Sequence, residues 1–202
     1  MSAMKIKLIF LMIGLPSMFF SFQHAAAGQA DVNVEVRIIQ QDKDSKLIPF
    51  SRNRPLHTGD FRASPPKAYT PGVAATYSGI KMTIASRTEN GETTVLVTLF
   101  TYFNPEESWM KPKGKNALVL AHEQKHFDLT ALQTCRLYHA IRTASFSSGW
   151  HEQLLKIRKQ YLEELQHLQD QYDKDTRHGT VREQQEAYNK RIMEKMGAQD
   201  CW

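Results

Sequence analysis

Residues 117–132 are a run of helix-forming residues with the pattern His-Glu-x-x-His at its centre. Residues four positions apart on an α-helix project from nearly the same face, so His122 and His126 can point to one site. Two imidazoles placed in this way can each bind the same Zn²⁺ through a ring nitrogen. Glu123 projects beside them, where its carboxylate can take a proton from a metal-bound water molecule. The pattern is typical of zinc metallopeptidases.

The residues around this motif favour a metal site over an ordinary amphipathic helix. They are apolar on nearly every side of the helix: Ala117, Leu118, Val119, Leu120, Ala121, Phe127, Leu129, Ala131 and Leu132. A helix that is apolar all round is expected to be buried. Because His and Glu are rarely buried without partners, a buried pair of histidines with a glutamate indicates a bound ion.

The first 27 residues have the features of a signal peptide. Lys5 and Lys7 precede an apolar run at residues 8–22, and residues 25–27 are three alanines that offer a cleavage site. The run is short for a membrane span, so we expect cleavage near Ala27, export to the periplasm or the medium, and no stable membrane insertion afterwards.

Residues 28–202 are enough for one domain with its own core. Removal of residues 1–27 takes away two lysines and no acidic residue, so the formal net charge falls from +5 to +3, which is too small to indicate a nucleic-acid partner. The domain contains both cysteines of the chain, Cys135 and Cys201. An even number of cysteines in an exported protein predicts a disulfide, with two free thiols as the alternative. Neither cysteine is at a spacing typical of metal ligands.

Strand patterns precede helix patterns along the chain. Residues 31–39 alternate between apolar and polar, and two further alternating runs near residues 77–85 and 95–99 flank Asn90 and Gly91, which predicts a β-hairpin. The proline-rich connection between the first strand and the hairpin is expected to be irregular, with Leu56 and Phe61 as core anchors.

Three helices are expected after the hairpin, at residues 116–143 with Asn116 as N-cap, from about residue 150 to the break at residues 177–180, and at residues 181–196. The order predicts an α+β fold. A small antiparallel sheet (residues 31–104) is followed by a three-helix C-terminal half (residues 116–198) that carries a zincin-like motif helix.

A catalytic zinc site needs a third protein ligand. His139 is on the motif helix but points away from the metal face, while His151 and His167 suit exposed positions on the second helix. A loop histidine, His178, precedes a glycine that would let the backbone aim its side chain. The residues alone leave His178 and three acidic candidates open: Glu152, Glu163 and Glu164.

The motifs of this chain resemble those of a bacterial family of predicted secreted Zn-dependent proteases. The resemblance rests on residues 122–128 (HEQKHFD), 108–109 (SW) and 172–179 (YDKDTRHG), and on matches from Pro55 onward, so it covers most of the chain after the signal peptide. It implies a zinc-dependent peptidase outside the cytoplasm. It also implies that the histidine of the last motif, His178, is the third ligand.

The resulting hypothesis is a secreted zinc-dependent peptidase that acts on a peptide or protein substrate. His122, His126 and His178 would bind Zn²⁺, and Glu123 would serve as general base. Tyr172 is a candidate donor to the oxyanion, and Asp128 and Asp173 are candidate partners of the ligand histidines. Two alternatives remain, namely an envelope protein stabilised by zinc without hydrolytic activity, and a zinc amidase acting on cell-wall material.

Overall fold

The computed structural model describes residues 32–42, 46–67 and 72–201, so the predicted signal peptide lies outside the described residues. The predicted α+β fold is confirmed. The strands are β1 (Val32–Ile38), β2 (Ile48–Pro49), β3 (Ala74–Ala75), β4 (Ser78–Glu89), β5 (Glu92–Phe103) and β6 (Trp109–Met110). The helices are α1 (Ala117–Thr143), α2 (Trp150–Thr176) and α3 (Arg182–Gly197), with short 3₁₀ turns at Thr58–Asp60 and Pro112–Gly114.

The long hairpin of β4 and β5 is the centre of the main sheet. The two strands pair in antiparallel fashion along their whole length, and the turn residues Asn90 and Gly91 have φ angles of 52° and 86°. Positive φ at both central residues is the geometry that two-residue hairpins prefer, and Asn-Gly adopts it readily. The hairpin prediction is therefore confirmed.

One strand departs from the expected antiparallel arrangement. β1 pairs with β5 in parallel, with Val32 opposite Thr93 and Ile38 opposite Leu99. Parallel neighbours need a long connection, and the chain from β1 to β5 includes the irregular connection, β2 and the whole of β4. The alternating pattern of residues 31–39 predicts a strand but contains no information on its direction.

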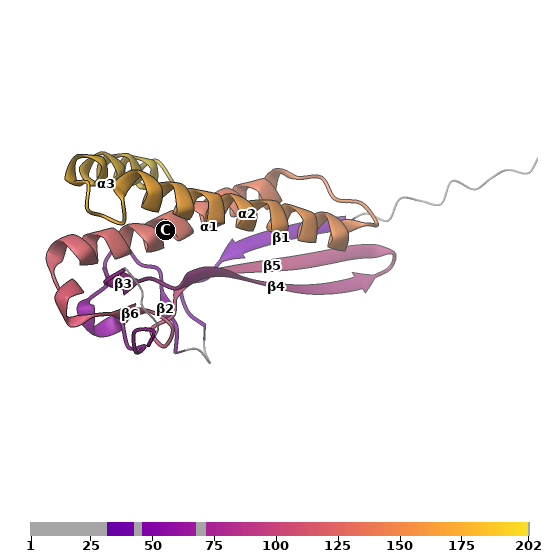
Figure 1. The fold of residues 1–202 in the computed structure, drawn as a ribbon. Coiled ribbons are helices and arrows are strands. Elements are labelled where there is room, and N and C mark those ends of the chain that lie inside the picture. The colour runs from indigo at the N-terminus through magenta and orange to yellow at the C-terminus, as the bar shows by residue number, and fades with distance from the viewer. Residues whose placement is uncertain (1–31, 43–45, 68–71, 202) are drawn as a thin grey trace, which may run out of the picture.

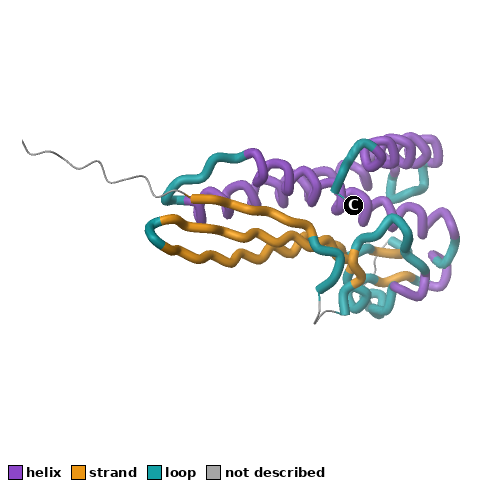
Figure 2. Tube along the Cα trace, turned by 180° about the vertical axis from the view of Figure 1, so that it is seen from behind, coloured by secondary structure: helices purple, strands orange, loops and turns teal. Residues whose placement is uncertain are grey.

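Helices cover one face of this sheet. Val95, Val97 and Leu99 of β5 are fully buried on that face, where Leu137 and Ile141 of α1 and residues of α2 meet them. Figures 1 and 2 show α1 and α2 running along the sheet. The third helix, α3, lies by the N-terminal half of α1, at the end of the molecule away from the β4–β5 turn. The described residues include no helix with the length and apolar character needed to cross a membrane.

A second core cluster lies under the N-terminal half of α1. Leu56 and Phe61 are buried in it, which confirms both as anchors of the irregular connection. Phe127 of α1 contacts Phe50 and Phe103 ring to ring, with centroids 5.3 and 5.9 Å apart. This cluster fixes the rotation of α1, and its member Tyr172 packs against both His122 and His126.

Cys135 of α1 and Cys201 after α3 form a disulfide, with their Cα atoms 5.8 Å apart. The predicted pairing is confirmed. The bridge spans 66 residues and ties the C-terminal tail to the middle of α1.

Replacing Cys201 by Ser is expected to lower the free energy of unfolding by ~4 kcal/mol, because the disulfide restricts the unfolded chain through a long loop. Urea denaturation of the oxidised wild type and of the variant measures the loss. The Cys135→Ser, Cys201→Ser double variant should show the same loss, since the cross-link is absent from both. A variant as stable as the wild type would contradict the prediction.

Candidate metal centre

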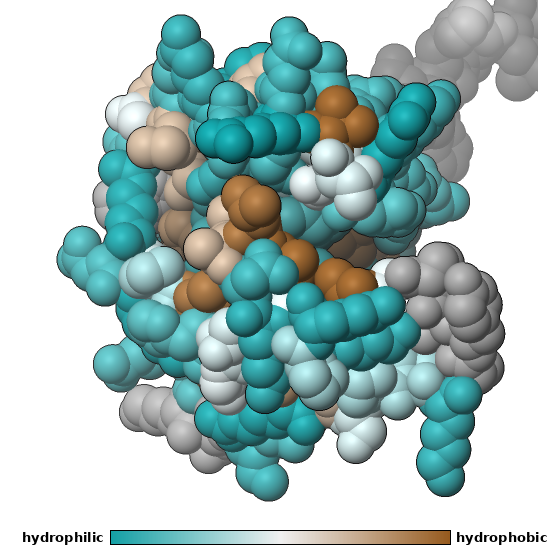
Figure 3. Space-filling model, turned by 60° about the vertical axis from the view of Figure 1, so that its left-hand side comes forward, coloured by the Kyte–Doolittle hydropathy of each residue, from teal (hydrophilic) through white to brown (hydrophobic). Residues whose placement is uncertain are grey.

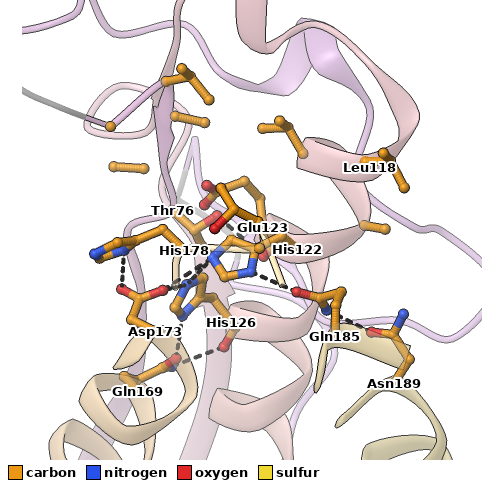
Figure 4. Close-up of a pocket in the computed structure, with 18 of the residues that line it drawn as sticks. Thr76, Leu118, His122, Glu123, His126, Gln169, Asp173, His178, Gln185 and Asn189 are labelled. Atoms are coloured by element: carbon orange, nitrogen blue, oxygen red, sulfur yellow. Dashed lines mark hydrogen bonds and ion pairs between the residues drawn. The ribbon is translucent and has the colours of Figure 1, made fainter. Parts of the chain in front are cut away.

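Three side chains from two helices converge beside the second core cluster. The Nε2 atoms of His122 and His126 on α1 are 3.2 Å apart, and each is 3.0 Å from Oδ1 of Asp173 near the end of α2. Figure 4 shows the three side chains pointing toward one another. They form a group that could hold a metal ion.

Two glutamines fix which nitrogen of each imidazole carries the hydrogen. Gln169 donates through Nε2 to the backbone carbonyl of His126 (2.9 Å), so its Oε1 accepts from His126 Nδ1 at 2.6 Å. The Tyr172 hydroxyl donates to the His122 carbonyl and accepts from Gln185 Nε2 at 2.6 Å, and Gln185 Oε1 then accepts from His122 Nδ1 at 2.9 Å. Both neutral rings therefore turn an Nε2 lone pair toward Asp173.

Two lone pairs and a carboxylate oxygen at this separation repel one another unless a metal cation, or a proton on one of the rings, lies among them. Neutral imidazole nitrogens and a carboxylate oxygen are ligands that Zn²⁺ accepts. Atoms bound at ~2.0–2.1 Å to one tetrahedral ion lie about 3.3 Å apart, close to the separations found here. The donor set thus fits a zinc ion in both chemistry and spacing.

The same groups shift one another's pKa values. Burial lowers the pKa of His126, but the carboxylates of Asp173 and Glu123 outweigh burial and hold that pKa above its ordinary value. Burial raises the pKa of Asp173, yet its interactions with the imidazoles of His122 and His126 hold it well below its usual range. Asp173 is therefore an anion at neutral pH, as a metal ligand must be.

The floor of the site is packed tightly. The ring of Tyr172, fully buried, stacks on His122 with centroids 4.7 Å apart and meets His126 edge to face at 4.9 Å. Gly179 lies against His122 on another side, and a Cβ at this position would be 3.0 Å from the imidazole Cγ. The φ of Gly179 is +76°, which also favours glycine. The imidazoles therefore have little freedom to turn.

Glu123 is buried next to the two histidines. It lines the same cavity, and its Oε2 has no hydrogen-bond partner among the described residues. Leaving a buried carboxylate oxygen unpaired is costly, so such an atom is expected to meet a water molecule or an ion, or to have a catalytic role. Its place beside His122 is visible in Figure 4.

The candidates for the third ligand are placed differently. His178 lines the cavity, but its side chain is 76% exposed and its Nδ1 contacts the second oxygen of Asp173 at 3.3 Å. The three acidic candidates, Glu152, Glu163 and Glu164, do not line the cavity. Two of them form ion pairs elsewhere, Glu163 with Lys159 and Glu164 with Arg136. Asp173 occupies the position that the sequence interpretation gave to His178, and His178 as a ligand stays a prediction.

Some site residues carried no sequence signal. Gln169 and Gln185 hold the histidines, whereas the candidate Asp128 bonds to Gln124 and Lys125 instead. Gln169 and Gln185 are recognised as site residues only from their contacts with His126 and His122 in the folded chain. Tyr172 packs beneath the imidazoles, and burial raises the pKa of its hydroxyl far above the ordinary value, so it stays neutral.

Replacing Gln185 by Ala is expected to weaken zinc binding ~10–100-fold, because partners that orient a ligand histidine typically contribute this much. Competition with a chromogenic chelator measures the affinity. Gln184→Ala, one residue earlier on α3, is the matched control and should leave the affinity unchanged. Equal affinities for the wild type and the Gln185 variant would contradict the positioning role.

Fold and site together define an α+β protein with a candidate metal centre between its first two helices. No family model matches the chain, and no curated protein or solved structure matches it. The resemblance to predicted secreted zinc proteases therefore stays a prediction.

Proposed function

We propose that this protein is an exported zinc-dependent peptidase in which His122, His126 and Asp173 bind the metal and Glu123 is the general base. One observation carries the proposal. Three metal-ligating atoms converge on one point, and a buried carboxylate oxygen without a hydrogen-bond partner lies beside them. The export of the protein rests on the signal-peptide features of the first 27 residues.

The openness of the site favours catalysis over a structural role. Structural zinc sites are closed by four protein ligands, whereas catalytic sites keep one position open. The candidate group among the described residues has three members, and it borders a cavity of about 830 Å³. Substrate and water can therefore approach the centre from the cavity.

The residues of the chain have separable roles in this mechanism. A bound zinc ion supplies a Lewis acid that acidifies water and polarises a carbonyl group. Glu123 accepts the proton of the attacking water and passes it to the leaving amine. Gln169 and Gln185 keep the Nδ1 hydrogens in place, and Tyr172 and Gly179 prevent the imidazoles from turning. The contact of His178 with Asp173 Oδ2 leaves Oδ1 facing the histidines.

The cavity wall at residues 73–76 suits an extended peptide. Val73 accepts a hydrogen bond from Lys111, and Ala74 lies opposite Met110 in the β3–β6 pair. Because hydrogen-bonded positions alternate along antiparallel strands, Ala74 and Thr76 direct their backbone groups away from β6. Both residues line the cavity. A substrate backbone could pair with this edge by strand addition.

Apolar side chains also border the cavity. Val73, Leu118 and Val119 line it, and Leu118 is 69% exposed. Figure 3 shows apolar atoms gathered in the middle of a mainly hydrophilic face at this end of the molecule. Exposed apolar side chains in a cavity supply contacts for apolar groups of a ligand. The expected substrate is therefore an unstructured polypeptide with apolar side chains near the cleaved bond.

The test is the metal content of the purified mature protein, with casein hydrolysis before and after chelation. We expect one zinc per chain, and activity that chelation removes and zinc restores. A parallel assay on cell-wall fragments separates a peptidase from an amidase. A chain that binds no zinc under any loading condition would overturn the proposal, as would a zinc-loaded chain that hydrolyses neither substrate.

A further inference from the structure

A second group of metal-ligating side chains lies between α1 and the C-terminal tail, and none of its members lines the cavity. Cys135 and His139 are one helical turn apart on α1, and Asp200 and Cys201 follow one another in the tail after α3. The ligand atoms of these four residues all lie within 4.8 Å of one another. The His139 Nε2 is 3.2 Å from Asp200 Oδ1 and 3.6 Å from Cys201 Sγ.

The disulfide occupies both sulfurs in this state of the protein. Reduction would convert them into two thiols, and thiolates are strong zinc ligands, at ~2.3 Å from the metal. Two cysteines, a histidine and an aspartate make up the four protein ligands of a closed tetrahedral site. We propose that the reduced chain binds Zn²⁺ through Cys135, His139, Asp200 and Cys201.

The positions of the four residues suit the small rearrangement that this binding needs. Thiolates on one zinc ion lie about 3.8 Å apart, farther than the sulfurs of a disulfide. Cys135 is buried on a helix, whereas Asp200 is exposed and Cys201 is partly exposed in a non-helical tail. The tail can therefore move outward while α1 keeps its place. His139 is partly exposed and points at the tail already.

The chemistry needs an external dithiol as reductant. The dithiol is oxidised to its own disulfide while the Cys135–Cys201 bond takes up two electrons and two protons. Zinc binding then releases the two thiol protons to solvent. The ion would join the same two points of the chain as the disulfide does, so zinc would replace the covalent cross-link between α1 and the tail.

Cobalt(II) titration of the mature protein tests the proposal and distinguishes this site from the cavity site. The protein is reduced with dithiothreitol and freed of the reagent without air. We expect the reduced chain to bind one more equivalent of cobalt than the oxidised chain, with a thiolate-to-cobalt charge-transfer band. The cavity site has nitrogen and oxygen ligands only, so this band reports the cysteine cluster whether or not the proposed peptidase function holds.

Variants show whether all four residues take part. His139→Ala and Asp200→Ala should each lower the affinity of the reduced chain for zinc, with the histidine variant losing at least ~10-fold. His167→Ala, an exposed helix histidine elsewhere, is the control. Circular dichroism during heating provides a second measurement, in which zinc should raise the melting temperature of the reduced wild type by more than that of Cys201→Ser, which keeps only the cavity site.

Either of two results would overturn the proposal. One is a reduced, folded chain that gains no thiolate band on adding cobalt. The other is a cobalt band that zinc displaces from His139→Ala and from Asp200→Ala at the same zinc concentration as from the wild type. The cysteines would then bind the metal without the other two residues.

Discussion

Replacing Glu123 by Gln is expected to abolish peptide hydrolysis and to leave one zinc ion bound per chain. Glutamine has nearly the same shape but cannot accept the proton of the attacking water, and loss of a general base typically lowers rates by ~10²–10⁴-fold. Glu123 is the buried side chain whose Oε2 has no hydrogen-bond partner among the described residues. The measurements are kcat/KM on a casein-derived peptide and zinc content by mass spectrometry.

The matched control is Glu163→Gln, the same change at an exposed helix position paired with Lys159. It should keep full activity and full zinc content. If the Glu123 variant hydrolyses peptide as fast as the wild type, Glu123 is not the base. If it loses zinc together with activity, the residue supports the metal instead.

Replacing Asp173 by Ala is expected to lower zinc affinity by ~100-fold or more, and replacing His178 by Ala by only ~10-fold. Asp173 Oδ1 is 3.0 Å from both histidine Nε2 atoms, whereas His178 contacts the other oxygen of the same carboxylate. A direct ligand should therefore matter more than a side chain that orients it. Chelator competition at fixed pH and salt measures both affinities.

Asp170→Ala is the control for this pair, because Asp170 also lines the cavity from α2 but its carboxylate bonds to Gln166. Its zinc affinity should equal that of the wild type. The reverse order of effects, with His178→Ala the weaker binder, would make His178 the third ligand, as the family resemblance implies.

Local signals in the sequence predicted the elements well. The Asn116 side chain accepts hydrogen bonds from the backbone N–H groups of Leu118 and Val119, so the N-cap prediction rested on a contact within four residues. The turn at Asn90 and Gly91 likewise depends on the φ preferences of those two residues. The disulfide followed from the cysteine count and the expected export.

The rest of the site depends on contacts between distant residues. Arg177 and His178 adopt left-handed conformations, with φ of 47° and 53°, before Gly179. Such values are uncommon outside glycine, so the predicted break at residues 177–180 did not indicate a turn that leaves the His178 side chain exposed. Gln169 and Gln185 touch the motif histidines from 43 and 63 residues away, and glutamine has no characteristic spacing from a metal motif.

The link between Cys135 and Cys201 makes the chain between them a closed ring. Asp173 and Gln185 belong to this ring, and α1 belongs to it from residue 135 onward. A protease that cuts either interhelical connection, at residues 144–149 or 177–181, would therefore release no fragment. Both pieces would stay attached through the sulfur atoms, and the segment that bears Asp173 could not diffuse away from His122 and His126.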